Sequence, residues 1–119
     1  MLSVVYGANC ATQREQLWED LRLINLAHGQ IPWAILGYFN IARYMDEKLG
    51  GNKLTFKQLT SFNTLIDDLS LSEIRSSANY WSWHNNVGDR RILVRLARVL
   101  CNDIWLTKLP ESSYEAMSI

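Results

Sequence analysis

The chain has 119 residues, which is enough for one small domain and too few for two. Hydrophobic residues make up 48% and charged residues 20%, a globular composition rather than a disordered one. The 12 basic side chains balance the 12 acidic ones, so no overall field attracts nucleic acid or an anionic membrane. Binding to either would therefore need a local patch.

The cysteines and the N-terminus limit the cellular setting. Cys10 and Cys101 are far apart and lack metal-ligand spacing, so we interpret both as buried small hydrophobes. No apolar run approaches the roughly 18 residues of a membrane span. The N-terminus has neither the basic nor the apolar region of a signal peptide. We expect an intracellular protein, in nucleus or cytoplasm, without membrane contact.

The first part of the chain predicts a strand, a helix and a second strand. Residues 4–6 (Val-Val-Tyr) favour a short strand. Thr12 and Glu15 have the spacing of a capping box, and apolar residues at helical spacing follow over 17–24. The apolar run 33–36 does not alternate with polar residues and predicts a strand that is covered on both faces.

The second part combines clear helix signals with one ambiguous segment. Thr55 and Gln58 form another capping-box pattern ahead of a helix. The predicted elements are a loop at 42–54, a helix from 56 to 66, a strand at 79–83, a turn at 85–89, a helix or a strand at 92–100 and a short helix at 103–109. This order predicts an α/β or α+β sandwich.

Five short motifs follow one another along the chain. They are residues 5–9 (Val-Tyr-Gly-Ala-Asn), 37–40 (Gly-Tyr-Phe-Asn), 46–51 (Asp-Glu-Lys-Leu-Gly-Gly), 81–85 (Trp-Ser-Trp-His-Asn) and 95–100 (Arg-Leu-Ala-Arg-Val-Leu). In this order and spacing the chain resembles the endonuclease domain of plant LINE-type retrotransposons. That domain belongs to the endonuclease/exonuclease/phosphatase superfamily, with DNase I and the exonuclease III-like enzymes. The resemblance implies that residues 1–119 are a single partial domain of the four-layer α/β/β/α sandwich, truncated at both ends.

The resemblance also implies a chemistry that two substitutions remove. Family members cleave DNA phosphodiester bonds with Mg²⁺, and an Asp in the pattern Gly-Asp-Phe-Asn activates the water. Tyr38 stands at that position, and a phenol with a pKa near 10 is neutral at pH 7. In the pattern Arg-Leu-Asp an Asp orients the catalytic His, and Ala97 stands there instead. No catalytic residue is therefore expected to be intact.

Other family positions divide into those that survive and those that fall outside the chain. Tyr6, Asn9 and Asn40 match substrate-contacting positions, and Trp83 is a further candidate for substrate binding. The resemblance places the metal-binding Glu upstream of residue 1 and the closing Ser-Asp-His motif downstream of residue 119. We expect no metal site and no bound cofactor, although the family uses Mg²⁺.

Each of these residues also has a purely structural interpretation. Tyr6 alone would be a packing residue, and Asn40 alone a turn former. Trp81 and Trp83 would share one strand face, which suits a protein core better than a base-stacking platform. The arginines at 90, 91, 95 and 98 could contact phosphates, although such clusters are more often solvated.

Three hypotheses for function follow. The first is an inactive, degenerate fragment of a retroelement DNA endonuclease. The second is a remnant that still binds nucleic acid, so weakly bound DNA is the only partner indicated and no protein partner is defined. The third is a poorly folded or untranslated pseudogene product. Because the resemblance implies that neighbouring strands are missing, we also expect the side chains at 33, 36, 81 and 83 to be poorly enclosed.

Overall fold

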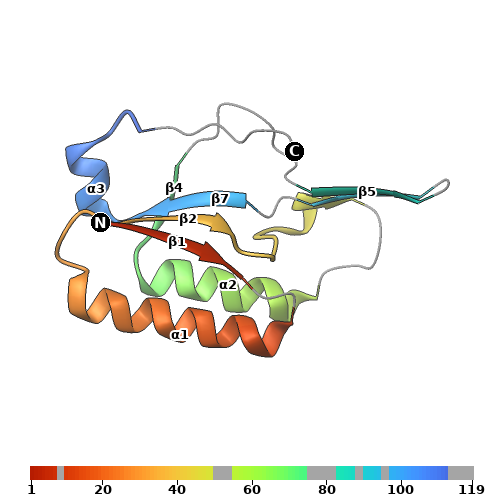
Figure 1. Ribbon diagram of the computed structural model, residues 1–119, viewed down its shortest axis with the longest axis horizontal. Coiled ribbons are helices and arrows are strands. Elements are labelled where there is room, and N and C mark those ends of the chain that lie inside the picture. The colour runs from red at the N-terminus through yellow and green to blue at the C-terminus, as the bar shows by residue number, and fades with distance from the viewer. Residues whose placement is uncertain (8–9, 50–54, 75–82, 88–89, 95–96, 113–119) are drawn as a thin grey trace.

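The chain folds as an α+β protein. The computed structural model describes residues 1–7, 10–49, 55–74, 83–87, 90–94 and 97–112, with only the backbone at 49, 83–87 and 90–94. In chain order the elements are β1 (Leu2–Tyr6), α1 (Ala11–His28), β2 (Ala34–Tyr38), the 3₁₀ helix η1 (Met45–Glu47), β3 (Lys48–Leu49), α2 (Phe56–Asp68), β4 (Ser72–Glu73), β5 (Trp83–Val87), β6 (Arg90–Val94), β7 (Ala97–Cys101) and α3 (Asp103–Lys108) (Figure 1).

The main sheet has four strands in the order β1-β2-β7-β4. β1 and β2 run parallel, which requires a crossover connection, and α1 provides it. β7 lies antiparallel to β2 on one side and to β4 on the other. The predicted strand at 33–36 is thus confirmed, although it starts at Ala34 and runs through Gly37 to Tyr38.

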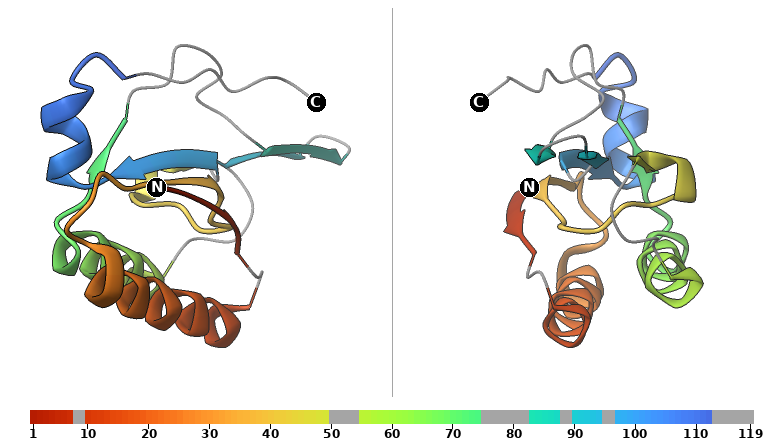
Figure 2. Two further views of the ribbon diagram at one scale, coloured as in Figure 1. Left: turned by 60° about the vertical axis from the view of Figure 1, so that its left-hand side comes forward. Right: turned by 90° about the vertical axis from the view of Figure 1, so that its right-hand side faces the viewer.

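α1 and α2 lie side by side and cover one face of this sheet (Figure 2). The core between the helices and the sheet contains three aromatic rings. The ring centroids of Trp18 and Phe62 are 5.0 Å apart in a stacked arrangement, and those of Phe39 and Phe62 are 5.3 Å apart. Ile35 and Leu100 contribute the sheet side of the same cluster. Residues that alternate with these two along β2 and β7 therefore point to the opposite face of the sheet.

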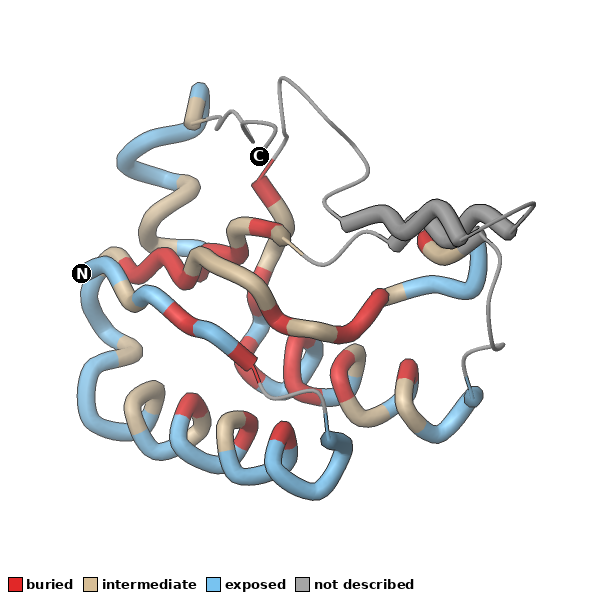
Figure 3. Tube along the Cα trace, turned by 45° about the vertical axis from the view of Figure 1, so that its right-hand side comes forward, coloured by how far each residue is buried: buried red, intermediate tan, exposed pale blue. Residues whose placement is uncertain are grey.

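The opposite face is covered at one end only. Ala34, Ile74 and Cys101 form a small buried cluster there, against which Trp105 and Leu106 of α3 pack. On the same face the side chains of Leu2, Val4 and Tyr6 in β1 are exposed, as the pale segments of β1 in Figure 3 show. The expectation that residues 33–36 are covered on both faces therefore holds for residues 33–35, which are buried, and holds in part for Leu36, which is half-buried.

Only one of the two predicted capping boxes forms. Thr55 Oγ1 accepts from Gln58 N at 3.2 Å, and Gln58 Oε1 accepts from Thr55 N at 3.1 Å. The predicted box at Thr12 is wrong, because α1 begins two residues earlier than a Thr12 cap requires, with Cys10 as its N-cap and no side-chain capping bond. Cys10 is exposed at that position, so its interpretation as a buried hydrophobe is also wrong, whereas Cys101 is buried as predicted.

Trp33 corrects the expectation of a poorly enclosed core. Its side chain is 0% exposed, its Nε1 donates to Ser3 Oγ at 2.9 Å, and its backbone N–H donates to Asn102 Oδ1 at 3.1 Å. A buried indole with its polar atom satisfied is a well-formed packing site. Leu36 is half-buried, while residue 81 and the side chain of residue 83 lie outside the described residues.

The second sheet contains β3, β6 and β5 in that order, all antiparallel. It corrects two predictions: η1 and β3 interrupt the loop expected at 42–54, and β5 extends to Val87 through the first part of the predicted turn. Residues 79–82 and 88–89 lie outside the described residues. The ambiguous segment 92–100 is strand in β6 and β7, and the predicted short helix is α3, confirmed. No helix in the described ranges is long and apolar enough to cross a bilayer.

Candidate functional site

Three residues singled out from separate motifs lie in one row across the main sheet. Tyr6 of β1 is directly opposite Tyr38 of β2, and Tyr38 is directly opposite Ala97 of β7. All three lie on the face away from α1 and α2, because they alternate with core residues along their strands. The positions at which the resemblance expects two aspartates are therefore nearest neighbours on adjacent strands.

The two tyrosines form an aromatic pair at this end of the sheet. Their ring centroids are 6.1 Å apart with the planes tilted by 55°, within the range of favourable aromatic contacts. Tyr6 is 81% exposed, whereas Tyr38 and Ala97 are half-buried. The row therefore presents one exposed phenol ring, one partly covered ring and a methyl group.

Asn40 joins this row through the segment that follows β1. Its Nδ2 donates to the carbonyl oxygen of Gly7, and Gly7 N in turn donates to Tyr38 O at 2.7 Å. Asn40 has a φ of 54°, in the left-handed region that asparagine tolerates better than most residues. A Cβ at Gly7 would clash with the backbone carbonyl of Phe39, so only glycine permits this close approach. The amide of Asn40 thus braces the backbone beside the tyrosine pair.

Arg14 of α1 holds the backbone at Asn40 from the helix-covered face of the sheet. It belongs to the first turn of α1, is 5% exposed, and its Nη1 donates to the carbonyl oxygen of Asn40 at 3.2 Å. Burial lowers the pKa of this guanidinium from its ordinary value. Arg14 was not identified as a site residue from the sequence, because no local pattern links a helix N-terminus to a turn 26 residues away.

Two candidates from the sequence, Asn9 and Trp83, remain to be placed. Asn9 lies outside the described residues. Trp83 begins β5 in the second sheet, where it is paired with Val94 of β6. Its side chain is not described, so the choice between core and stacking platform for Trp81 and Trp83 stays a prediction.

The residues of the row do not fit a magnesium ion. Mg²⁺ in proteins is held by carboxylates together with water or substrate phosphates. The row offers two phenols, one methyl group and one amide that already donates to Gly7. Within the described part of the chain, no group of three or more His, Cys, Asp or Glu side chains is placed to hold a metal. We therefore derive no metal-dependent step for this site.

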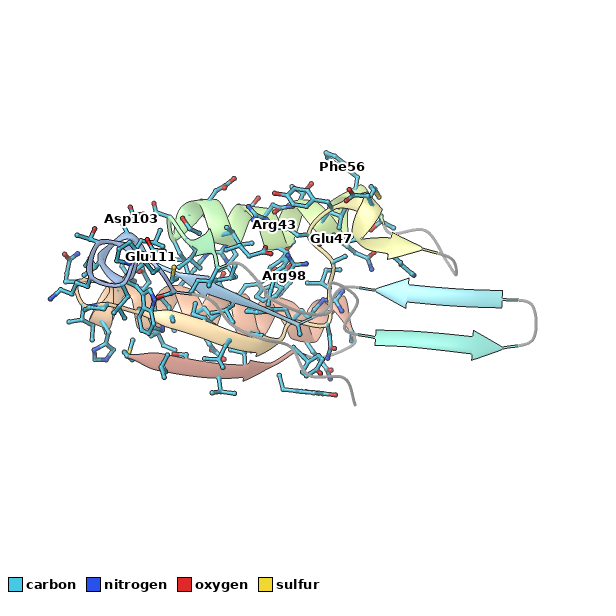
Figure 4. All side chains as sticks on the ribbon, turned by 90° about the horizontal axis from the view of Figure 1, so that it is seen from above. Arg43, Glu47, Phe56, Arg98, Asp103 and Glu111 are labelled. Atoms are coloured by element: carbon cyan, nitrogen blue, oxygen red, sulfur yellow. The ribbon has the colours of Figure 1, made fainter. Side chains whose placement is uncertain are left out.

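A buried cluster of charged residues was missed by the sequence analysis. Arg98 has a fully buried side chain, with Nη2 2.5 Å from Glu47 Oε1 and Nη1 2.7 Å from Glu73 Oε1. Arg43 adds a second cation, with Nη1 3.5 Å from the same oxygen of Glu73. Figure 4 shows the labelled side chains of Arg43, Glu47 and Arg98 gathered where η1, α2 and β7 meet.

Glu47 also organises the backbone of the segment before η1. Its Oε1 accepts from Arg43 N at 2.5 Å and from Tyr44 N at 3.2 Å. Asn63 of α2 closes the cluster, because its Oδ1 accepts from Arg43 Nε and its Nδ2 donates to Arg43 O, both at 2.7 Å. The cluster therefore ties the segment after β2 to α2, β4 and β7.

From the sequence, the arginines at 90, 91, 95 and 98 were interpreted either as phosphate contacts or as solvated residues. For Arg98 both interpretations are wrong, because its side chain is buried. It is neither solvated nor available to a phosphate, because its guanidinium contacts two carboxylates and lies 5.6 Å from the ring centroid of Phe62. The signal was present in the strand pattern: Arg98 shares a face with Leu100, so an inward arginine should have acidic partners. The side chains of Arg90, Arg91 and Arg95 lie outside those described.

Comparison with known proteins adds no family to this description. No protein-family model matches the chain, and no curated protein matches it at a significant level.

Proposed function

We propose that this chain is a non-cleaving domain of the DNase I-like type, derived from a metal-dependent DNA endonuclease of a LINE-type retroelement. One observation carries the proposal. Tyr6, Tyr38 and Ala97, chosen from three motifs far apart in the sequence, lie on adjacent strands in one row, and Asn40 contacts the same end of the sheet. Motifs that matched by chance would have no reason to converge.

The same row supports the loss of cleavage. Hydrolysis in this class needs a carboxylate that activates water and a second that orients a histidine. The side chain at position 38 is a phenol and not a carboxylate, and the methyl side chain at position 97 cannot accept a hydrogen bond. Because positioned acid-base groups each contribute typically 10²–10⁴-fold, the loss of two removes about four orders of magnitude or more of rate.

The fold is compatible with one half of the four-layer sandwich. The main sheet carries two helices on one face, and its other face exposes apolar side chains beyond the end that α3 covers. In the four-layer arrangement a second sheet packs on that apolar face. We assign the DNase I-like architecture on this pattern together with the placement of the motifs.

The proposal is tested by incubating the purified chain with supercoiled plasmid and Mg²⁺ or Mn²⁺. No conversion to nicked circles is expected above a buffer control. Metal-dependent nicking that co-purifies with the chain would overturn the proposal.

A second candidate function is binding of single-stranded nucleic acid without cleavage. It is favoured by the exposed ring of Tyr6 next to Tyr38, since bases stack on such aromatic surfaces for about 1–3 kcal/mol each. Arg98 cannot contribute, because it is buried against Glu47. Fluorescence anisotropy with a labelled oligonucleotide tests this role: Tyr6→Ala should weaken binding at least fivefold, roughly what the loss of 1 kcal/mol gives. Tyr44→Ala, a half-exposed tyrosine elsewhere, should leave affinity unchanged, and equal effects of the two variants would remove this candidate.

A further inference from the structure

β1 is an edge strand with an ordered set of outward backbone groups. Among the described strands, the sheet order puts β2 on one side of β1 and no strand of the main sheet on the other. At its two ends β1 bonds to β2 through odd-numbered residues, with Met1 O accepting from Ala34 N at 3.0 Å and Gly7 N donating to Tyr38 O at 2.7 Å. Because bonding direction alternates along a strand, the N–H and C=O groups of the even-numbered residues point to the open edge.

The same even-numbered residues carry exposed apolar side chains. Leu2, Val4 and Tyr6 are 64%, 79% and 81% exposed, respectively. Natural edge strands are usually protected by a charged residue, a proline or a bulge, and the sequence Leu-Ser-Val-Val-Tyr has neither charge nor proline. Its register with β2 is continuous from residue 2 to residue 6, so there is no bulge within β1 either. This edge is built to accept another strand.

We infer that the strand it accepts is β1 of a second copy of this chain, paired antiparallel about a two-fold axis at Val4. In that register Val4 faces Val4 of the copy, and Leu2 faces Tyr6 of the copy. All three outward-bonding residues of each copy then fall at hydrogen-bonded positions, because those positions recur at every second residue of an antiparallel ladder. The two main sheets become one continuous sheet.

A second copy fits better than an unrelated peptide because the edge complements itself. Every pair of outward-bonding residues in this register joins two apolar side chains, and no charge is brought against a like charge. The two-fold arrangement also closes after two chains and leaves no further β1 edge, so it gives a dimer and not a fibre. Pairing of five residues per strand buries less surface area than a standard protein interface. The dimer should therefore dissociate and re-form reversibly at protein concentrations between micromolar and millimolar.

Charge placed at the axis residue tests the inference in the intact chain. Sedimentation velocity over this concentration range should show a monomer–dimer equilibrium for the wild type. Val4→Lys and Val4→Glu should each raise the dissociation constant roughly tenfold, because like charges then meet at the axis and an apolar pair is lost. An equimolar mixture of the two variants should recover the dimer, since a lysine of one copy then faces a glutamate of the other at the axis. Leu26→Lys, at a position 83% exposed on α1, is the matched control and should dimerise like the wild type.

A further variant separates edge pairing from stacking of the two apolar sheet faces. Leu36 lies next to Val4, one strand in from the edge, so Leu36→Lys should retain the dimer if pairing occurs at the edge. Far-UV circular dichroism confirms that each variant is folded before it is compared. A wild type that stays monomeric at millimolar concentration overturns the inference. The inference is also overturned if Val4→Lys dimerises like the wild type, or if the mixture of the two charged variants does not recover the dimer. A folded Leu36→Lys variant that is monomeric overturns it as well.

Discussion

Arg98 and Glu47 form a fully buried ion pair, with Nη2 of Arg98 2.5 Å from Oε1 of Glu47. The pair joins the start of β7 to the end of η1, and the two residues are 51 positions apart in the chain. Removing a charge from water is costly, so each member depends on the other for its burial. The pair therefore holds in place the segment that connects the candidate site to the second sheet.

Arg98→Met should lower the free energy of unfolding by about 3–5 kcal/mol, because it leaves Glu47 buried without its cation. Urea denaturation followed by circular dichroism measures the change. The double variant Arg98→Met/Glu47→Leu should recover part of the loss, since it removes both charges. Arg22→Met is the control: its ion pairs with Glu19, at 3.0 Å, and with Asp68, at 3.3 Å, are partly exposed, and each should contribute less than about 1 kcal/mol. Equal losses in Arg98→Met and Arg22→Met would contradict the role of the buried pair.

Thr55→Ala should destabilise the protein by about 1 kcal/mol, because it removes the acceptor that caps Gln58 N at the start of α2. Thr12→Ala is the matched test at the other helix, where the threonine has the same spacing to an acidic residue but makes no capping bond. It should leave the unfolding free energy unchanged or slightly raised, since alanine has the higher helix propensity. A loss at Thr12 as large as that at Thr55 would restore the capping box predicted from the sequence.

The two cysteines should differ strongly in reactivity. The nearby backbone N–H groups of Gln13 and Thr12 favour the thiolate and lower the pKa of Cys10, and this residue is exposed. Burial raises the pKa of the Cys101 thiol. Because the thiolate is the reactive form, alkylation of Cys10 should reach its half-maximal rate at a lower pH than alkylation of an ordinary cysteine thiol. Peptide mass spectrometry after iodoacetamide treatment measures both sites. In denaturant the two cysteines should be alkylated at similar rates. Similar alkylation rates for Cys10 and Cys101 in the native chain would contradict the predicted difference in reactivity.

The row of positions 6, 38 and 97 can be tested by restoring carboxylates. Tyr38→Asp with Ala97→Asp should place two acidic side chains with Cβ atoms about 4.5–5.5 Å apart, because the residues are directly opposite on adjacent strands. The double variant should melt lower than the wild type without metal, owing to like-charge repulsion. Mn²⁺ should raise its melting temperature by a few degrees, while each single variant responds less. If Mn²⁺ does not raise the melting temperature of the double variant, the two positions do not form a shared metal site.

Local signals in the sequence predicted the elements that depend on local interactions. α2 follows from Thr55, Gln58 and an apolar spacing of about 3.6 residues, and these are contained within the helix itself. The equivalent pattern at Thr12 misled, because Cys10 takes the extended N-cap conformation and Glu15 instead accepts from Ser61 of α2. The contact between Glu15 and Ser61 joins α1 to α2, and a pattern confined to the start of α1 does not contain it.

The candidate site and the charged cluster depend on long-range register. Motif order identified Tyr6, Tyr38 and Ala97, but their position in one row follows from strand pairing across the sheet. Arg98 looked like a surface residue because its partners Glu47 and Glu73 lie 51 and 25 residues away. Only its position on the same strand face as Leu100 could have indicated burial.

Plasmid nicking measures whether the domain proposed as non-cleaving hydrolyses DNA. Purified chain is incubated with supercoiled plasmid in Mg²⁺, in Mn²⁺ and in chelator, beside an Asn40→Gly variant that keeps the left-handed backbone but loses the amide. We expect the plasmid to stay supercoiled to the same extent in every reaction. Nicking that requires the metal, follows the chain through purification and disappears in Asn40→Gly would contradict it.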